Sequence, residues 1–438
     1  MKILFVNHSF LPYSSTGVEN YTYTLAKYLS HKDEVLIYSA IFDPSKERFK
    51  KHRYQYDGLD IISFYHDSVY RDFSETYLSR RQDELFEEII KEFSPDVVHF
   101  QHIMFHSVGY IDILNRKDIP SILTLHDFYY LCPDLGQRLF LGRYRCKNKF
   151  PLKCALCFKI SKINISEIDK RLYNQGRRIP LVQKIAKDLP ELSYLIKGMR
   201  ILRRIPTAND IIVREQAMLS FLGGMKIIIS PSAYYKEIYE RYTNHPAIVH
   251  LDYGFEIDGP LPDKKGDGGV QTIGFIGTIS RHKGAHLLLE LANRFKGSIK
   301  IVVWGNDKND IMLSKRIKDN KFIEYRGQFE PKNKRDIFNE IDYLLVPSIW
   351  EENSPLVIHE ALIYNTPVIA SNIGGNAELI IEGKNGFTFD PYNLYSLFRL
   401  IEKIQNNNIR IKEVDNSVVM DISEHAKRLY KIYKSLLS

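Results

Sequence analysis

Two glutamates separated by seven residues, Glu352 and Glu360, follow a short apolar run that ends at Ser348. Pro355 between them suits the first turn of a helix, so we expect Glu352 in the loop before this helix and Glu360 one to two turns inside it. Free N–H groups at the helix start, around Ser354–Val357, attract phosphate, and carboxylates accept hydrogen bonds from sugar hydroxyls. The pair could therefore grip two polyols joined by a diphosphate. The alternative is one ordinary surface glutamate and one ordinary helix glutamate.

Two glycine turns are further candidates for contacts with an anion. Gly17 lies in the turn of residues 12–19 and Gly277 in that of residues 274–284, and each turn follows a predicted strand. A glycine lets backbone N–H groups approach an anion closely. Neither turn matches G-x-G-x-x-G or a P-loop, so each could be an ordinary tight turn. Lys283, just before a predicted helix, makes a phosphate site and a plain turn equally good interpretations of the second.

All four cysteines of the chain fall within 26 residues, at Cys132, Cys146, Cys154 and Cys157. The last two form a C-x2-C pair, and four thiolates could close a tetrahedral zinc site. Basic residues among them would help to hold thiolates. The first two cysteines lack a partner at knuckle spacing, so four reduced thiols are the preferred interpretation and a structural zinc is the alternative.

The basic charge of the chain is concentrated in one segment. The whole sequence has 61 Lys and Arg against 53 Asp and Glu, a formal net charge of +8. Residues 138–204 hold 18 basic and 4 acidic side chains, a net +14, and the other 371 residues are at −6. Such a block meets phosphate on nucleic acid, on an anionic membrane or on a ligand, or it is a solvated helical surface. Residues 192–204 are spaced as an amphipathic basic helix, which could lie in a membrane interface or, more commonly, pack on the core.

Length and composition restrict the class of protein. The 438 residues predict two or three domains, and the hydrophobic content of 44% is too high for a disordered chain. The sequence has no run of about 18 apolar residues that could span a membrane as a helix, and the apolar run that breaks at Asn7 is too short for a signal peptide. Four cysteines exclude a disulfide-built scaffold, so we expect a cytoplasmic protein with reduced thiols.

Short apolar, β-branched runs alternate with helical patterns in two series along the chain. The first series predicts strands at 2–8, 34–40, 59–65, 96–102, 121–126 and 226–230, with helices at 20–30 and 80–93. The second predicts strands at 271–279, 299–305, 322–327, 343–346, 367–370 and 386–389, with helices at 285–295, 334–339 and 355–364. This alternation indicates an α/β protein with two doubly wound parallel sheets.

The domain boundaries follow from the same patterns. The Gly- and Pro-rich segment 254–270 predicts a linker, with one domain at 1–253 and another at 271–420. Residues 128–222 fit neither series and predict a helical insertion in the first domain. A last helix within 421–438 could return to the first domain. Parallel sheets bind ligands beyond the carboxyl ends of their strands, so the two domains would share one cleft. His99 and His102 follow at the end of a predicted strand, and we expect them to be cleft or core residues and not metal ligands.

One long motif makes the similarity to a known family specific. The segment VPSIWEENSPLVIHEAL at 346–362 resembles the E-x7-E signature of the retaining family 4 glycosyltransferases, which have the GT-B fold. The resemblance continues through PVIASNIGGNAE at 367–378 and EGKNGF at 382–387, and through PDVVH at 95–99 and TLHD at 124–127. It covers roughly residues 1–127 and 225–390. It implies two Rossmann-like domains that face a cleft, and a nucleotide sugar as donor substrate.

The resemblance also implies roles for individual residues. Glu360 would bind the ribose hydroxyls of the donor, and Glu352 would contact hydroxyls of the transferred sugar. Lys283 would neutralise the diphosphate, which Gly17 would face across the cleft, and His126 would lie beside the sugar and support the reaction centre. Backbone amides near residues 353–357 would hold the distal phosphate. The remaining implied donor-binding positions are Gly277, Thr278, Arg281, Asn353, Ser354, Pro355, Leu356 and Val357.

One position departs from the family pattern. The family usually has Arg directly after the glycine that is Gly277 here, and this chain has Thr278. Loss of one preorganised charge typically weakens leaving-group stabilisation by a few kcal/mol, and Arg281 is close enough in sequence to substitute. The sequence contains no Asp-x-Asp, so cationic side chains and helix N-termini are expected in place of a Mg²⁺-bridged diphosphate. In the family picture the leaving diphosphate takes the acceptor proton, with retention.

These features together predict an enzyme that moves a sugar from a nucleotide sugar to a saccharide or lipid-linked acceptor in cell-surface polysaccharide or glycoconjugate synthesis. The acceptor would bind the first domain and its insertion, and the basic block could hold the protein on the inner face of an anionic membrane. We expect no cofactor apart from a possible structural zinc, and no nucleic-acid partner. The alternatives are another GT-B enzyme, such as a nucleotide-sugar epimerase, or a catalytically inactive sugar-nucleotide-binding protein.

Overall fold

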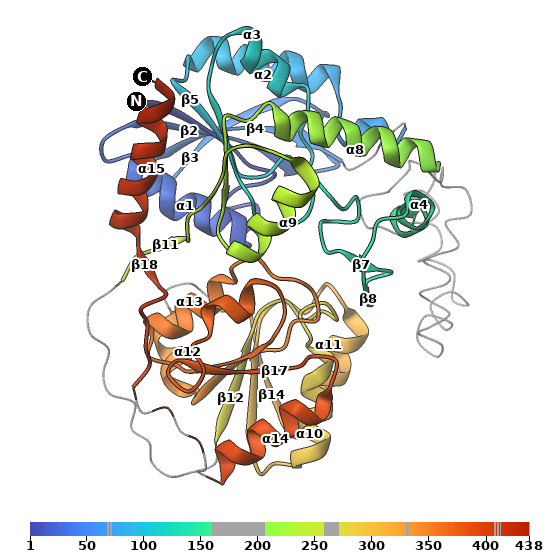
Figure 1. The fold of residues 1–438 in the computed structure, drawn as a ribbon, viewed down its shortest axis with the longest axis vertical. Helices are drawn as coiled ribbons and strands as arrows, with labels where there is room; N and C mark the ends of the chain where they lie inside the picture. The colour runs from blue at the N-terminus through green and yellow to red at the C-terminus, as the bar shows by residue number, and fades with distance from the viewer. Residues whose placement is uncertain are drawn as a thin grey trace. The chain divides into compact units, whose positions relative to one another are not determined.

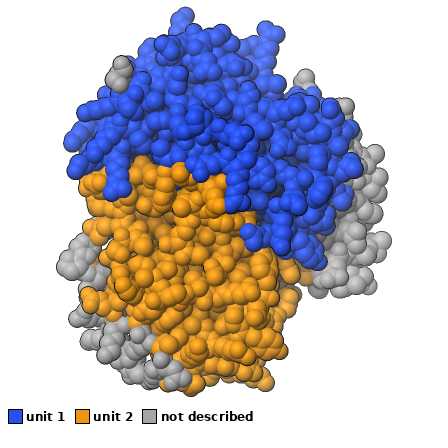
Figure 2. All heavy atoms as spheres, viewed as in Figure 1, with its two compact units in different colours: residues 1–230, 239–249, 426–438 blue, residues 231–238, 250–425 orange. Residues whose placement is uncertain are grey.

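The computed structural model divides the chain into two compact units, coloured separately in Figure 2. Unit 1 comprises Met1–Ser230, Tyr239–Val249 and Ala426–Ser438, and unit 2 comprises Pro231–Ile238 and His250–His425. The structure describes residues 1–67, 70, 72–159, 206–257, 271–329, 333–406, 409, 411 and 413–437. Each unit is built on one large sheet, and the elements are labelled in Figure 1.

The sheet of unit 1 has eight strands in the order β10-β9-β6-β5-β1-β2-β4-β3. They are β1 (Lys2–Val6), β2 (Glu34–Phe42), β3 (Lys51–Tyr56), β4 (Leu59–His66), β5 (Val97–Phe100), β6 (Ser121–Thr124), β9 (Ile227–Ser230) and β10 (Ile248–His250). The run from β4 through β2, β1, β5 and β6 to β9 is parallel, and β3 pairs antiparallel with β4. The strand order reverses between β1 and β5, as in a doubly wound sheet.

Helices cover both faces of this sheet, α2 and α3 on one and α1 and α15 on the other (Figure 1). The helices of this part of the chain are α1 (Gly17–Leu29), α2 (Arg80–Phe93), α3 (Tyr110–Arg116), α4 (Pro151–Lys159), α8 (Ala208–Gly223), α9 (Ala233–Thr243) and α15 (Ile422–Leu437). On the first face, Phe86 of α2 stacks on Tyr110 of α3 with 4.0 Å between ring centroids. On the second, Tyr433 of α15 hydrogen-bonds His99 of β5 at 2.7 Å. Cover on both faces explains why the strands read as continuous apolar runs.

The sheet of unit 2 has six strands in the order β14-β13-β12-β15-β16-β17. They are β12 (Thr272–Ile276), β13 (Lys300–Trp304), β14 (Ile323–Gly327), β15 (Tyr343–Val346), β16 (Val368–Ser371) and β17 (Gly386–Phe389). All five pairings are parallel. Counted in chain order this is 3-2-1-4-5-6, so the point where the winding reverses lies between β12 and β15.

Two separate cores hold the helices of unit 2 against its sheet. The helices are α10 (His286–Phe295), α11 (Ile311–Lys318), α12 (Lys334–Glu340), α13 (Leu356–Ile363), α14 (Leu394–Gln405) and the 3₁₀ turn η3 (Gly374–Leu379). Ile301 and Val303 of β13 lie in one core with α10, α11 and α14. Val302 and Trp304 lie in the other with α12 and α13. Successive side chains of a strand point to opposite faces, so one strand serves both cores.

The two doubly wound parallel sheets predicted from the sequence are confirmed, and every predicted strand is present with its ends shifted by a few residues at most. The antiparallel edge strand β3 was not predicted, because its residues are polar and half of them are exposed. The linker prediction is wrong at its start: β11 (Gly254–Phe255) pairs with β18 (Met420–Asp421). A side chain at Gly254 would lie 2.6 Å from His425 Cβ, so only glycine fits there.

The segment predicted as a helical insertion, 128–222, is only partly described. Its described elements include the short antiparallel pair β7 (Leu139–Phe140) and β8 (Tyr144–Arg145), as well as α4 and most of α8. Residues 160–205, including the amphipathic stretch 192–204, lie outside the described residues. The domain bounds 1–253 and 271–420 stay a prediction. In the part of the chain that the structure describes, no helix has the length and apolarity to cross a membrane.

Candidate functional site

The first cluster lies at the reversal point of the unit 2 sheet, where β12 and β15 end side by side. The loop after β12 contains Gly284, whose φ is +74° and whose added Cβ would lie 1.7 Å from the carbonyl oxygen of Pro347. The loop after β15 donates a hydrogen bond from Ile349 N to His282 O at 2.9 Å. A glycine is required for this close approach of two backbones. The contact brings residues about 70 positions apart in the chain together.

Lys283 and Glu352 meet at this point. Lys283 Nζ lies 2.7 Å from Glu352 Oε1, and Ser348 Oγ donates to the same oxygen at 2.7 Å. Glu352 is 5% exposed. Burial favours its neutral form, but the charge of Lys283 and the hydrogen bonds from Lys283 and Ser348 outweigh burial and hold the pKa of Glu352 below its ordinary value. The result is a fixed, ionised lysine–glutamate pair, with the ammonium group also 5.2 Å from the Trp350 ring centroid.

Two glycines, Gly374 and Gly375, lie against the backbone that carries Glu352. Gly375 N donates to Glu352 O at 2.8 Å, and an added Cβ at Gly375 would lie 1.5 Å from Asn353 O. The Asn353 side chain accepts from Ser232 Oγ at 2.6 Å, and Tyr235 donates to Glu351 O at 2.7 Å. These contacts explain why residues 231–238 belong to unit 2.

The second predicted glutamate lies on α13, which begins at Leu356 directly after Pro355. Glu360 is in the second turn, as expected, and it pairs with Lys334 of α12, whose Nζ lies 2.7 Å from Glu360 Oε1. The sequence did not identify Lys334 as the partner of Glu360, because Lys334 lies in no recognisable motif. Within the same segment, Ser354 Oγ and His359 Nε2 are 2.8 Å apart, and burial lowers the pKa of His359 to about 4.

The remaining candidates of unit 2 lie on the turn after β12. Gly277 N donates to Trp304 O at 3.0 Å, and a Cβ added to Gly305 would lie 1.8 Å from Gly277 O. Thr278 and Arg281 follow in the same loop, and Arg281 is exposed. Burial and then the charge of Arg281 lower the pKa of His286 to about 4, so this guanidinium lies close to the start of α10.

A second cluster lies at the corresponding edge of the unit 1 sheet, after β1, β5 and β6. His102 Nδ1 accepts from Met104 N at 3.0 Å. Its Nε2 therefore carries the proton and points it at Asp127 Oδ2, 3.2 Å away. The ring of His8 lies 4.7 Å from that of His102, and its Nε2 is 3.3 Å from Glu19 Oε1. Burial lowers the pKa of His8 to about 4.

His126 belongs to this second cluster. Its Nε2 lies 2.9 Å from Gln101 Oε1. A carboxamide oxygen only accepts hydrogen bonds, so this contact selects the tautomer with the proton on Nε2. Burial, followed by the charges of His102, His8 and His99, holds the pKa of His126 well below its ordinary value. The imidazole is consequently neutral near pH 7, and Gln101 is fully buried beneath it.

Gly17 is the first residue of α1 and is exposed. The helix start is fixed by Glu19, a fully buried carboxylate that accepts from Thr16 N at 3.1 Å. Sequence reasoning missed Glu19, although Thr16-x-x-Glu19 is a capping box that could have revealed it. Gly17 and His126 thus lie in unit 1, and the other candidate residues, Lys283, Glu352 and Glu360 among them, lie in unit 2.

Comparison with protein-family models gives two matches. Residues 15–154 match the model described as Glycosyltransferase Family 4, and residues 262–418 match the model described as Glycosyl transferases group 1. The second range contains the Lys283–Glu352 pair and Glu360, and the first contains Gly17 and His126.

Two curated relatives show how far the sequence similarity extends. An uncharacterized 42.6 kDa protein in the cps region of Klebsiella pneumoniae is 23% identical over 396 residues, which cover 86% of this chain and 87% of that protein. The D-inositol 3-phosphate glycosyltransferase of Corynebacterium urealyticum is 25% identical over 189 residues, 37% of this chain and 44% of that enzyme.

Two solved structures share the fold along the whole chain. Anabaena HepE in complex with UDP has a TM-score of 0.62 at 14% identity, with 99% of this chain and 100% of that chain covered. Sucrose-phosphate synthase from Thermosynechococcus elongatus has a TM-score of 0.64 at 15% identity, with 99% and 98% covered.

Proposed function

Because the chain belongs to the group 1 glycosyltransferases of family 4 and is a transferase that acts on a nucleotide sugar, we propose that unit 2 binds this donor through the Lys283–Glu352 pair and that the sugar is transferred with retention. The observation that carries the proposal is the 2.7 Å ion pair at the point where the unit 2 sheet reverses. Open α/β sheets bind ligands at such a point. HepE, with the same fold, is crystallised with UDP.

The pair suits a diphosphate joined to a sugar. A lysine ammonium group has three N–H donors, so Lys283 can keep Glu352 and donate to a phosphate oxygen at the same time. Glu352 stays ionised because of Lys283 and Ser348, so its oxygens remain acceptors for sugar hydroxyls. Glu360 would accept from ribose hydroxyls, with Lys334 holding its carboxylate in place.

The leaving diphosphate needs positive charge that the usual arginine would supply. Thr278 stands at that position, and Arg281 in the same loop would take over part of the task together with Lys283. Backbone amides at the start of α13, around Asn353–Val357, would hold the distal phosphate. The diphosphate would then accept the proton of the acceptor hydroxyl as the bond to the sugar forms.

Unit 1 would supply neutral hydrogen-bonding groups. The His126 imidazole is uncharged and fixed by Gln101, so it can contact sugar hydroxyls without competing with Lys283 for the phosphates. Gly17 is at the exposed start of α1 and would face the diphosphate. The acceptor would be a saccharide or a lipid-linked saccharide in polysaccharide synthesis, in keeping with the cps-region location of the Klebsiella relative.

The test measures donor binding and turnover in matched variants. Thermal shifts with UDP-, GDP- and ADP-sugars would identify the donor, because a ligand that binds only the folded state raises the unfolding temperature. Glu352→Gln should then lower turnover about 100-fold, as loss of one preorganised group does. Glu290→Gln, on the exposed side of α10, should have no effect. Equal turnover in both variants would contradict the proposal, and turnover of donor without acceptor would identify an epimerase.

We also propose that the exposed part of the insertion holds the enzyme on an anionic membrane. Four apolar side chains there are strongly exposed: Tyr144 (65%), Phe150 (58%), Leu152 (75%) and Leu156 (50%). Arg143, Arg145 and Lys147 between them are exposed as well. Apolar side chains that enter the interface and cations that meet anionic headgroups are the combination used by peripheral membrane proteins.

Co-sedimentation with vesicles tests this second proposal. The protein should bind vesicles that contain anionic lipid, and binding should weaken with salt because charge attraction is screened. The double variant Phe150→Ser/Leu152→Ser should lose most of the binding. The control Ile311→Ser/Tyr395→Ser removes side chains of similar exposure (66% and 73%) from unit 2 and should not change it. Binding that ignores anionic lipid would refute the proposal.

A further inference from the structure

We propose that the four cysteines of unit 1 form a structural zinc site that holds the insertion together. All four sulfur-bearing residues line one cavity of about 30 Å³, which is enough space for a single ion. Cys154 and Cys157 are one turn apart on α4, and Cys132 and Cys146 lie in the loop that precedes α4. The fold therefore supplies the missing partners of the C-x2-C pair.

Contacts around Asp134 show that sulfurs from both ends of the segment converge. Cys157 Sγ donates to Asp134 Oδ2 at 3.3 Å, and Cys132 Sγ lies 3.8 Å from Asp134 O. The loop between them is also tied to Cys146, whose N donates to Arg138 O at 2.8 Å. Four cysteines of a 438-residue chain that has no others thus lie around one small space.

The loop that carries Cys132 and Cys146 has little regular structure of its own. Its described strands, β7 and β8, have two residues each. Three residues that are not glycine, Leu135, Arg138 and Leu141, have φ between 50° and 55°, a conformation that costs about 1 kcal/mol or more per residue. Small segments with few ladder hydrogen bonds and a small core are commonly stabilised by a metal. A zinc ion bound to both sides would offset this cost.

The charges that line the cavity suit a tetrathiolate site. Binding of Zn²⁺ by four thiols forms four Zn–S bonds and releases four protons to solvent, which leaves a net charge of −2 on the site. Arg138, Lys149 and Lys153 also line the cavity and would balance this charge.

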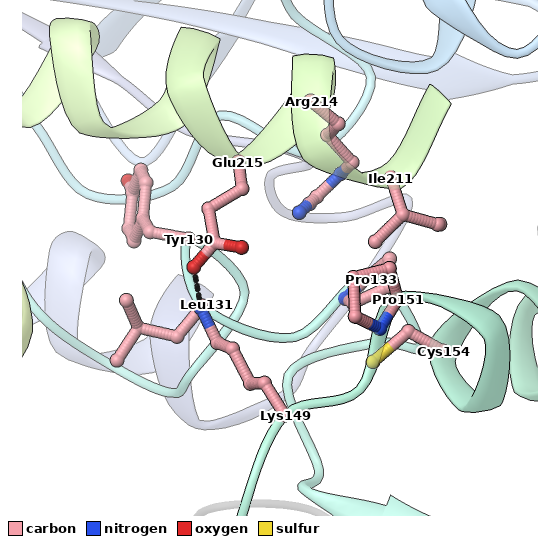
Figure 3. A pocket seen from close by; sticks show the side chains of 9 residues that line it. All are labelled: Tyr130, Leu131, Pro133, Lys149, Pro151, Cys154, Ile211, Arg214 and Glu215. Atoms are coloured by element: carbon pink, nitrogen blue, oxygen red, sulfur yellow. Dashed lines mark hydrogen bonds and ion pairs between the residues drawn. The ribbon is translucent and has the colours of Figure 1, made fainter. Parts of the chain in front are cut away.

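The neighbouring pocket shows what such a site would hold in place (Figure 3). There the Cys154 side chain of α4 lies across the pocket from the pair formed by Lys149 Nζ and Glu215 Oε1 at 2.6 Å. Arg214 of α8 donates to Tyr129 O at 2.9 Å. The loop is thus attached to α8 at two points. A zinc ion would add the attachment between the loop and α4.

The sulfurs must move inward to bind the ion. Among the described residues, no three His, Cys, Asp or Glu side chains already stand at coordinating distance. All four cysteines line the same cavity, so we expect rotation of the side chains and shifts of the strained loop to bring them together. Zinc binding should therefore be accompanied by a measurable rise in stability.

The experiment measures metal in the full-length chain purified under reducing conditions. We expect one zinc per chain, and cobalt substitution should give the thiolate-to-cobalt and d–d bands of a tetrahedral site. Cys146→Ser should lose the metal, whereas Cys146→His, which restores a ligand, should keep it. Asp134→Asn should also keep it, because Asp134 is not a proposed ligand. If Cys146→Ser does not fold, the cobalt spectrum of the wild-type chain still tests whether thiolates bind the metal.

Several results would overturn the site. They are wild-type protein that binds no zinc or cobalt, Cys146→Ser with full metal content, metal lost from Asp134→Asn, and a disulfide between these cysteines found by mass spectrometry of freshly purified protein. Donor binding by unit 2 does not depend on this site, so thermal shifts with nucleotides separate its failure from a failure of the proposed function.

Discussion

The carboxyl edges of the two sheets differ in chemistry although the strands are wound in the same order. At the edge of unit 2, the polar groups are ion pairs, Lys283 with Glu352 and Lys334 with Glu360. At the edge of unit 1, they are imidazoles, including His8, His102 and His126. One architecture therefore presents a lysine beside each glutamate in unit 2, and imidazoles beside the carboxylates Glu19 and Asp127 in unit 1.

The difference follows from what each environment does to a charge. Lys283 keeps a partner within 2.7 Å and is about one-third exposed, so both charges persist. Several histidines of unit 1 are desolvated, and burial lowers the pKa of His8 to about 4 and that of His106 to about 3. A diphosphate requires the first kind of edge, and sugar hydroxyls are matched by the second.

The largest expected effect is the loss of unit 1 stability in acid. The pKa values of His8, His66 and His106 are about 4, 4 and 3 in the folded chain, below about 6.5 for an unfolded histidine. Below pH 6.5 the unfolded chain binds protons that the folded unit does not, so the free energy of unfolding falls as pH drops toward 4, by up to about 3 kcal/mol per histidine. In unit 2 the pKa is lowered in the same way for His286 and His359, fewer histidines than in unit 1, so hydrogen exchange should show unit 1 opening before unit 2 at pH 5. Equal protection of both units from hydrogen exchange would contradict the expected difference in acid stability between unit 1 and unit 2.

The second effect concerns the charge of unit 2. Lys283→Gln removes the cation beside Glu352 and should lower kcat/KM about 100-fold, the scale for loss of one preorganised charge. The same variant should also weaken binding of the nucleoside diphosphate. Lys403→Gln, an exposed position of α14, is the matched control and should be unchanged. Steady-state kinetics with equal losses in both variants would show that Lys283 has no special role.

The smallest effect should separate the two edges directly. His126→Ala removes a neutral hydrogen-bonding group and should lower turnover about 10-fold, the scale for one hydrogen bond to a substrate. Affinity for the bare nucleotide, measured by calorimetry, should stay the same because the group is in unit 1. His31→Ala, an exposed position, provides the control. A loss of nucleotide affinity in His126→Ala would contradict the proposal that unit 2 binds the nucleotide and unit 1 contacts the sugar.

Much of the fold could be predicted because the spacing of apolar residues along the chain indicates which side chains are buried. The strand Tyr343–Val346 and the helix Arg80–Phe93 were predicted with their observed ends, since both are bounded by clear changes of periodicity. β3 was missed because an edge strand alternates exposed and half-buried residues and lacks an apolar run. The linker at 254–270 was misjudged at Gly254, whose small size serves contact with His425.

Site residues could be predicted from the sequence only where they belong to a recognisable motif. The types and the order of Glu352, Glu360 and Lys283 were readable, but the pairing of Glu360 with Lys334 was not. Nor did the sequence reveal that Gln101 orients His126. Such partners come from separate strands and helices, and their meeting depends on the sheet order and not on spacing along the chain.

The sequence by itself determined the two series of strands and helices, the position of the E-x7-E segment and the concentration of basic charge and cysteines in one stretch. Periodicity and residue type are local properties, and they are sufficient for these conclusions. The tertiary structure decided that Lys283 neutralises Glu352 and that four unevenly spaced cysteines line one cavity. Both depend on close backbone approach and on burial, which arise only when distant segments pack together.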